Sequence, residues 1–340
     1  CSAMPRKKYR RQTFKEEKAL LNKLWRLRKR SSPVLAGIVL IVSTILCLGE
    51  YCGWPVPSWS DVFRETNLWP TSYALESSEG AVTRIHFIDV GQADATLLED
   101  NGHFALIDAG LAADSEELLY YLRNAGVQEL DYLVMTHPHA DHIGAMEDIL
   151  TSFDVETFLL PMLPEESDQS AQVKEILKTA QQEQVPMRTM QAGEVYHVGQ
   201  AAVHVLQASV VDDNLNNLSP VLKFAASDVS CLFTGDGESP VENLALETGL
   251  DLSADLFQAG HHGSYTSNSR AFVSSIKPKA VVVSCGKDND YGHPHEAALR
   301  AFESVSASVY RTDLQGNIIA YVDAQGALQF ASENATDLAA

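Results

Sequence analysis

The sequence predicts an α/β domain of two sheets flanked by helices, preceded by one transmembrane helix. Short apolar runs typical of strands alternate with helical stretches from residue 81 onward, which indicates sheets covered by helices. One uncharged apolar run lies nearer the N-terminus. Of the 340 residues, 45% are hydrophobic and 21% are charged, a composition that supports a buried core and excludes a wholly disordered chain.

The charge of the chain is unevenly distributed. The formal net charge is −20, but residues 1–30 hold twelve Lys and Arg against two acidic residues, whereas residues 31–340 hold 13 basic and 43 acidic residues. A basic end on an acidic body indicates that the two parts meet different surroundings. The five cysteines are odd in number and scattered, which excludes a dense disulfide framework.

The apolar run Val34–Gly49 is the predicted membrane anchor. Its 16 residues carry no charge and fall short of the roughly 20 that cross a bilayer as a helix, but the flanking residues extend the span to 33–50. A buried core helix would not follow so many Lys and Arg residues, and no small-residue cleavage site of a signal peptide follows Leu48. The positive-inside rule places residues 1–32 in the cytoplasm as a basic segment and the body outside the cell, on a single-pass anchor in the cell membrane.

Residues 51–80 are predicted to be a linker, because they hold three prolines and several serines with no sustained period. Residues 81–330 form the predicted domain, and residues 331–340 a frayed tail. The strands expected in it are Val82–Val90, Ala95–Leu98, His103–Ile107, Tyr132–Thr136, Val195–Val198, Ala202–Gln207, Val221–Phe224, Ser230–Thr234, Leu256–Ala259, Ala280–Ser284, Val309–Arg311 and Ile318–Val322. The helices expected are Ser115–Asn124, His142–Phe153, Gln172–Gln184, Val241–Thr248, Arg270–Ile276 and Glu296–Ser304.

The strongest local signal is a cluster of metal-ligand side chains directly after a predicted strand. His137 and His139 are two residues apart, so in extended backbone their imidazoles leave the same side and reach one cation. Asp141 and His142 follow as the chain turns into a helix and point to a second position nearby. Core positions would be apolar, and a solvated loop has little reason for three imidazoles. The spacing therefore predicts a metal site. Four other histidines, in strands without such neighbours, are interpreted as ordinary packed or surface residues: His86, His103, His197 and His204.

The HxHxDH motif resembles that of the metallo-β-lactamase superfamily, and the resemblance extends along residues 82–325. Further motifs in family order are Phe87-Ile-Asp89-Val-Gly-Gln92-Ala-Asp94, Leu106-Ile-Asp108-Ala-Gly110, Phe233-Thr-Gly-Asp236, Gly260-His261-His262-Gly-Ser264 and Tyr291-Gly-His293-Pro294. This set is similar to the extracytoplasmic metallo-hydrolase domain of ComEC competence proteins. The resemblance implies an αββα sandwich. Full-length members of that family also have a many-helix channel, whereas these residues contain one predicted span.

The resemblance implies two divalent metal ions, zinc or manganese, held by His137, His139, Asp141, His142, Asp236 and His262. Asp236 would bridge the two cations; the structural alternative is a turn aspartate or helix cap. His261 and His262 compete as ligand, with a slight preference for His262. His293 stays open among a further ligand, a leaving-group acid and a helix-start residue.

The remaining candidate residues are expected to support the metals or to contact substrate. Asp108 would support the metal loop by hydrogen bonding rather than ligation. Asn216 stands where many superfamily members carry a histidine ligand, so the first metal would have fewer protein ligands. Asp89, Gln92 and Asp94 belong to the ComEC-type entry motif.

The implied activity is metal-dependent hydrolysis by a hydroxide shared between the two cations. Asp141 would orient the hydroxide, and His261 or His293 would protonate the leaving oxygen. The expected function is a membrane-anchored phosphodiesterase acting on nucleic acid or a smaller phosphodiester. An alternative is another extracellular ester, such as a cell-wall or phosphorylcholine phosphodiester. An alternative of another class is a non-catalytic membrane scaffold or sensor.

Charge argues against tight binding of a polyanion, because nucleic-acid binders usually carry a basic stripe and this body is acidic. Lys287, Arg300 and Arg311 are the candidates for a local basic patch near the metals. The expected partners are the phosphodiester substrate, the membrane, and a channel or uptake partner. The oligomeric state stays open.

Overall fold

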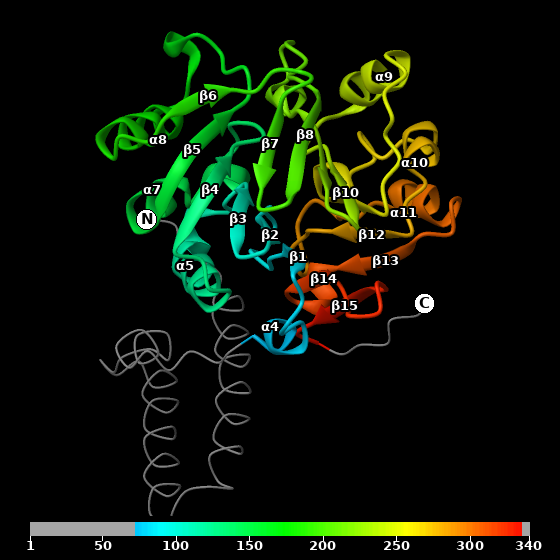
Figure 1. The fold of residues 1–340 in the computed structure, drawn as a ribbon. Coiled ribbons are helices and arrows are strands. Elements are labelled where there is room, and N and C mark those ends of the chain that lie inside the picture. Colours follow the sequence, from blue (N-terminus) through cyan, green and yellow to red (C-terminus); the bar gives the residue numbers. More distant parts are fainter. Residues whose placement is uncertain (1–71, 335–340) are drawn as a thin grey trace, which may run out of the picture. The chain divides into compact units, whose positions relative to one another are not determined.

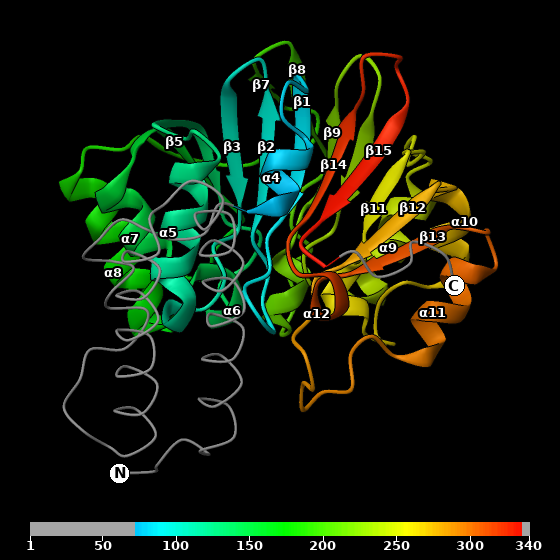
Figure 2. The same ribbon diagram turned by 90° about the horizontal axis from the view of Figure 1, so that it is seen from below.

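The computed structural model describes residues 72–334 and arranges them in four layers, with helices outside two central sheets (Figures 1 and 2). This confirms the predicted αββα sandwich. Within these residues no helix is both long enough and apolar enough to cross a bilayer. The predicted anchor at 33–50 and the basic segment at 1–32 lie outside the described residues.

The first sheet has eight strands in the order β15-β14-β1-β2-β3-β4-β5-β6. Strands β3 to β6 are parallel to one another, and the other pairs are antiparallel. Their bounds are β1 Thr83–Phe87, β2 Thr96–Asp100, β3 His103–Ile107, β4 Glu129–Val134, β5 Asp154–Leu160, β6 Met187–Thr189, β14 Ile318–Val322 and β15 Leu328–Ser332.

The second sheet has seven strands in the order β13-β12-β11-β10-β9-β8-β7. Here β10 to β13 are parallel, and β7 to β10 are antiparallel. Cys231 in β10 and Cys285 after β12 are free and buried. The bounds are β7 Val195–Val198, β8 Ala201–Gln207, β9 Val221–Ala225, β10 Ser230–Phe233, β11 Leu256–Gln258, β12 Ala280–Val283 and β13 Ser308–Arg311.

Helices α5, α7 and α8 cover the first sheet, and α9, α10 and α11 cover the second (Figure 2). Alternate side chains of each strand point to opposite faces; Leu232 packs under the helices, whereas Phe233 packs between the sheets. The helices are α4 Tyr73–Ser77, α5 Ser115–Asn124, α6 Ala140–Ile143, α7 Met146–Ser152, α8 Ala171–Gln182, α9 Ser239–Glu247, α10 Arg270–Ile276, α11 Glu296–Glu303 and α12 Thr312–Gln315. Four 3₁₀ turns join them: η1 Ala112–Asp114, η2 Glu166–Asp168, η3 Leu215–Leu218 and η4 Gly260–Gly263.

The single helix expected over residues 142–153 is two helices, α6 and α7, separated by Gly144 and Ala145; Gly144 keeps helical dihedral angles and Ala145 departs from them. A side chain at Gly144 would meet the backbone nitrogen of Ala112 at 2.2 Å and the carbonyl oxygen of Gly110 at 2.4 Å. The amide of Gly144 also donates to the carbonyl of Gly110 at 2.7 Å. The helix is therefore interrupted where the loop after β3 contacts the loop after β4.

Both predicted edges of the domain need correction. Helix α4 lies inside the predicted linker 51–80, and its Ala74 and Leu75 are buried in the core. The tail predicted to fray from residue 331 still contributes Ala331 and Ser332 to β15. Ser72, at the start of α4, hydrogen-bonds the carboxylate of Glu333 just after β15. The first and last described elements therefore lie side by side.

The two parallel blocks explain where a site forms. In each block the carboxyl ends of parallel strands open at the same edge of the sheet, which is where α/β proteins bind ligands. The predicted chemical motifs follow β3, β4, β10, β11 and β12. The fold thus brings residues that are up to 201 positions apart in the chain, Gln92 and His293, to one place.

His86 generates a prediction about stability and pH. It is fully buried in β1, between the hydroxyl of Tyr121 at 3.0 Å and Glu99 at 3.2 Å. Burial lowers the pKa of His86 below 6.5 despite the neighbouring Glu99. Between the lowered folded pKa and 6.5, the unfolded chain therefore binds a proton that the folded chain does not. The contribution of His86 is present above pH 6.5 and is lost as the pH falls, by at most about 1.4 kcal/mol per pH unit.

We expect His86→Gln to show a shallower loss of unfolding free energy between pH 7 and pH 5 than the parent chain, measured by denaturant titration at each pH. The control is His103→Gln, because a hydrogen bond to Asp131 raises the pKa of this exposed histidine. The His103 contribution has the opposite sign and is lost as the pH rises. Equal pH slopes for the parent and His86→Gln would contradict the prediction.

Candidate metal centre

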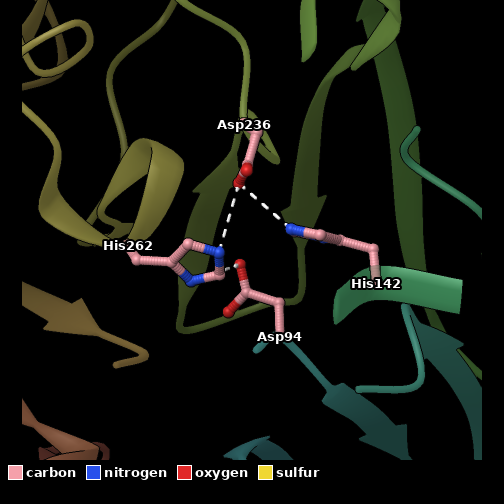
Figure 3. A group of neighbouring side chains, drawn as sticks. All are labelled: Asp94, His142, Asp236 and His262. Carbon is pink, nitrogen blue, oxygen red and sulfur yellow. Dashed lines mark ion pairs between the residues drawn. The ribbon is translucent and has the colours of Figure 1, made fainter. Parts of the chain in front are cut away.

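Four buried side chains bring potential ligand atoms within 4.8 Å of one another: Asp94, His142, Asp236 and His262 (Figure 3). They come from the β1–β2 connection, from α6, and from the loops after β10 and β11. Three of them are in the ligand set predicted from the sequence. Asp94, predicted as a supporting or substrate-contacting residue, lies in the group as well.

Asp236 is the centre of this arrangement, because its two carboxylate oxygens face different histidines. Its Oδ1 lies 3.2 Å from Nε2 of His142 and 3.7 Å from Nε2 of His262. Its Oδ2 lies 3.7 Å from Nε2 of His137 and 3.5 Å from Nε2 of His261. A carboxylate that directs one oxygen to each pair of histidines has the geometry needed to bridge two cations.

Around Oδ2 the predicted histidines also gather. Nε2 of His137 lies 3.0 Å from Nδ1 of His139, so the two imidazoles predicted to share a cation do converge. Asp141 lies on the other side, with Oδ2 3.4 Å from Nε2 of His262. The structure therefore brings together all six predicted ligands: His137, His139, Asp141, His142, Asp236 and His262.

The His261–His262 pair adopts an unusual backbone. Both residues have positive φ, 51° and 55°, a left-handed conformation that costs non-glycine residues energy and concentrates at functional sites. The amide of His261 donates to the carbonyl of Gly235 at 3.0 Å, which ties the turn to the Asp236 loop. Two consecutive left-handed residues send the two imidazoles to the two oxygens of Asp236.

Three atoms of the cluster test its fit to a metal. Nε2 of His142, Oδ1 of Asp236 and Nε2 of His262 are buried and make no hydrogen bond. Buried polar atoms almost always make a hydrogen bond, so three buried atoms that make none and face one point need a ligand. Imidazole nitrogens with carboxylate oxygens are a donor set that zinc and manganese accept. The residues present fit a divalent cation.

A layer of hydrogen bonds fixes the ligand side chains. Nδ1 of His142 donates to Oδ2 of Asp108 at 2.7 Å, so Nε2 is the nitrogen that faces Asp236. Asp108 also accepts from the amide and the hydroxyl of Thr136, directly before His137. Asp108 thus hydrogen-bonds residues of the metal loop and lies beneath that loop. This is the supporting position predicted from the sequence.

Two of these supporting contacts involve residues that the sequence did not reveal. Nδ1 of His262 donates to the carbonyl of Ser284 at 3.0 Å, and the amide of Gln258 donates to Asp94 at 2.8 Å. Gln258 is buried and polar at the end of β11. A glutamine in a strand that is otherwise apolar is the sequence signal that could have identified it.

The cluster is strongly coupled electrostatically. Burial lowers the pKa of His262, but Asp236 and Asp94 outweigh it and raise the value to about 9. Burial opposes the charge of His142 too, yet Asp236 and Asp108 raise its pKa well above the usual value. The same histidines lower the pKa of Asp236 against the effect of burial. Asp236 is therefore a carboxylate stabilised by surrounding positive charge.

The other predicted residues divide between the cavity and its surroundings. A cavity of about 360 Å³ opens beside the cluster. Asn216 lines it and donates to Glu238 at 3.2 Å, and its own Oδ1 has no hydrogen bond. Asp89 accepts from the amide of Gly91 in its own turn and is not among the cavity residues. Asp89 is the predicted residue that the fold does not bring to the cluster.

His293 lines the same cavity and is held by Gln92, whose amide nitrogen lies 3.2 Å from Nδ1 of His293. The imidazole ring centre is 5.8 Å from that of His261 and 6.0 Å from that of His262. Burial, followed by the charges of His262 and His261, lowers the pKa of His293 to about 4. Because Gln92 occupies Nδ1, His293 presents Nε2 as its remaining nitrogen.

Asn268 and Glu242 form a second support that sequence reasoning missed. The side chain of Asn268 accepts from the amide of Gly260 and donates to the carbonyls of Gly260 and Ser264. Buried Glu242 accepts in turn from the backbone amides of Asn268 and Ser269. The pair encloses the His261–His262 turn from both ends. Neither residue stands in a recognisable motif, since α9 contributes Glu242 from 18 residues upstream of Gly260.

Comparisons with known proteins agree with this geometry. The profile of the Metallo-beta-lactamase superfamily matches residues 88–186, which include Asp94, Asp108 and the His137–His142 motif. The chain is 32% identical over 268 residues to ComE operon protein 3 of Bacillus subtilis, a match that covers 72% of this chain and 33% of that protein. It is 29% identical over 245 residues to competence protein ComA of Neisseria gonorrhoeae, covering 72% of this chain and 32% of that protein. The chain thus spans about a third of the length of these relatives.

Among solved structures, a mutant of the CmlA β-hydroxylase of Streptomyces venezuelae is similar with a TM-score of 0.50. The match has 16% sequence identity and covers 70% of this chain and 54% of that chain. At this identity the likeness concerns the fold.

We expect Asp236→Asn to lower the amount of divalent metal retained after gel filtration, measured by elemental analysis, because an amide cannot present two anionic oxygens to two sets of histidines. The control is Asp228→Asn, whose carboxylate caps a surface turn through Ser227. Equal metal contents for the two variants would contradict a metal site at Asp236.

We expect Asn268→Ala to weaken metal binding by roughly tenfold, as loss of an outer hydrogen-bond partner commonly does, in competition titrations with a chromogenic chelator. The control is Ser269→Ala, one residue further on, because Ser269 caps α10 and does not bond the turn. A drop in thermal stability without a change in metal affinity would show that Asn268 supports the fold alone.

Proposed function

Because the described domain belongs to the metallo-β-lactamase superfamily, we propose that the chain is a metal-dependent phosphodiesterase with a centre for two divalent cations, zinc or manganese. The observation that carries the proposal is Asp236, whose two oxygens each face a separate pair of histidines. A cavity wide enough for a substrate opens directly on this carboxylate. A purely structural metal site would be closed by protein ligands.

Cations in this centre would supply a water molecule of lowered pKa and charge stabilisation for the phosphoryl oxygens. The chain's own residues position the reaction. Asp141 lines the cavity between the cluster and solvent, so its carboxylate can hold and orient the attacking water. His261 and His293 flank the cavity with ring centres 5.8 Å apart. Burial lowers the pKa of both imidazoles, so at neutral pH they would hydrogen-bond the leaving oxygen as neutral rings while the cations stabilise its charge.

Nucleic acid or a smaller phosphodiester is the proposed substrate. Two relatives are named as a ComE operon protein and a competence protein, which favours a role beside a DNA-uptake channel supplied by a partner. The proposed setting is the outer face of the cell membrane, with the chain anchored through residues 33–50. Protease added to intact cells should then remove the domain, and protection of the domain would contradict this orientation.

The domain is not expected to bind the phosphate backbone of a nucleic acid tightly. Of the three basic residues expected near the metals, Arg300 pairs with Glu296 and Arg311 pairs with Asp313 at 2.7 Å, whereas Lys287 is exposed in the loop after β12. The charge of the two arginines is largely compensated, and the body remains acidic. The phosphodiester would therefore be recognised at the metals rather than along a basic groove.

We expect the purified 340-residue chain, loaded with manganese or zinc, to hydrolyse bis(p-nitrophenyl) phosphate. Asp141→Asn should lower kcat by at least about 100-fold, because the water loses the carboxylate that orients it. Asp168→Asn, on the exposed turn η2, is the matched control and should leave kcat unchanged. Release of p-nitrophenolate is followed by absorbance. A chain that carries metal but cleaves neither this ester nor an oligonucleotide would support a scaffold or sensor instead.

A further inference from the structure

Four aromatic rings form a continuous row at the cavity, which we call the aromatic rim: Tyr265, His295, His293 and Tyr291. Successive ring centres are 4.9, 4.8 and 5.6 Å apart. The row begins in the turn after His262 and ends in the loop after β12. Both ends of the row lie at the surface, and one of its inner rings, His293, is 6.0 Å from the ring centre of His262.

The two ends of the aromatic rim are unusually exposed. Tyr265 and Tyr291 are each 68% accessible to solvent, the highest values among the large hydrophobic side chains that the structure describes. Tyr291 also lines the cavity, and its ring is stacked on His293 with an angle of 18° between the planes. An exposed tyrosine face next to a reaction centre is available to a flat ligand.

Hydrogen bonds hold the aromatic rim in place. The amide of Tyr265 donates to Nδ1 of His295 at 3.1 Å, which joins the two loops. The side chain of Asn289 donates to the carbonyls of Gly286 and His293 and accepts from the amide of His293. This closes the base of the loop that carries Tyr291. The rings are thus set in advance, so a ligand that stacks on them loses little freedom in ordering them.

The charge of the domain makes such a surface useful. An acidic body repels a polyanion, and Arg300 and Arg311 are already paired with carboxylates. A substrate that contributes affinity through neutral π faces avoids that repulsion. Base stacking on aromatic side chains provides this in proteins that bind single strands, and it tolerates any sequence.

We propose that the aromatic rim stacks the bases next to the scissile phosphodiester, so that the preferred substrate is a single-stranded nucleic acid. The proposal rests on the phosphodiesterase function proposed above and assigns Tyr265 and Tyr291 as specificity-determining residues. A choline group would need rings that face a common centre. Here the rings contact one another in a row and cross at 60° and 85° on either side of His295, so they enclose no common centre. The faces available to flat bases are those of the exposed Tyr265 and Tyr291.

The test compares two single strands of equal length and charge, an oligothymidylate and an oligomer of abasic sites, each with a terminal fluorophore. Both strands carry phosphorothioate linkages that resist cleavage, and their binding to the metal-loaded full chain is measured by fluorescence anisotropy. Tyr291→Ala and Tyr265→Ala should each weaken oligothymidylate binding by about tenfold and leave abasic binding unchanged. Tyr291→Phe should bind like the parent chain, because stacking does not need the hydroxyl.

Tyr120→Ala is the matched control, since Tyr120 is a partly exposed tyrosine on α5, away from the cavity, and it should have no effect. Equal losses of affinity for both oligomers, or no loss for either, would overturn the assignment. If Tyr291→Ala weakened the binding of p-nitrophenyl phosphorylcholine more than that of the oligothymidylate, the assignment would be overturned in favour of a choline-binding surface.

The outcome separates this inference from the proposed function. If the chain hydrolyses bis(p-nitrophenyl) phosphate but its binding of oligothymidylate ignores both tyrosines, the activity stands and the aromatic rim is not a base-binding surface. If base-dependent binding is present and no phosphodiester is cleaved, the stacking surface stands and the proposed hydrolysis fails.

Discussion

The buried negative charge of Asp236 is the interaction on which the site depends. A carboxylate removed from water is costly unless positive or hydrogen-bonding groups surround it. Here the pKa values of His142 and His262 beside one oxygen are raised, and His137 and His261 face the other oxygen. Together with Asp236, these four histidines belong to three separate loops. The need to compensate one charge therefore draws the ends of β4, β10 and β11 together, and it leaves unsatisfied atoms aimed at the space where cations fit.

Unfavourable backbone conformations accumulate around the same point. Asp108, His261 and His262 all have positive φ without being glycine. Each is held by buried hydrogen bonds: Asp108 by Thr136 and His142, and the histidine turn by Gly235 and Asn268. Such residues persist only where the surroundings determine their conformation. The rigidity of the centre is thus a property of the loops as much as of the sheets beneath them.

Much of this could be predicted from the sequence, because both main signals are local. Alternating apolar runs located most strands, and the spacing of His137, His139, Asp141 and His142 located the ligands. The rest depends on contacts between distant segments. Strands β5, β6 and β15 were missed. The break between α6 and α7 arises where the loop after β3 contacts Gly144, and the place of Asp94 in the cluster is set by Gln258 across the sandwich. Neither Asn268 nor Glu242 has a spacing that identifies it.

The contact between Ser72 and Glu333 has a consequence for how this domain can be built into proteins. Entry and exit of the folded region share one corner, through α4 and β15, while the reactive loops belong to the ends of other strands. A domain with adjoining ends can be spliced into, or appended to, a longer polypeptide without stretching its sheets. Evolution can therefore join the same domain to different neighbouring domains without changing the arrangement of its metal-ligand residues.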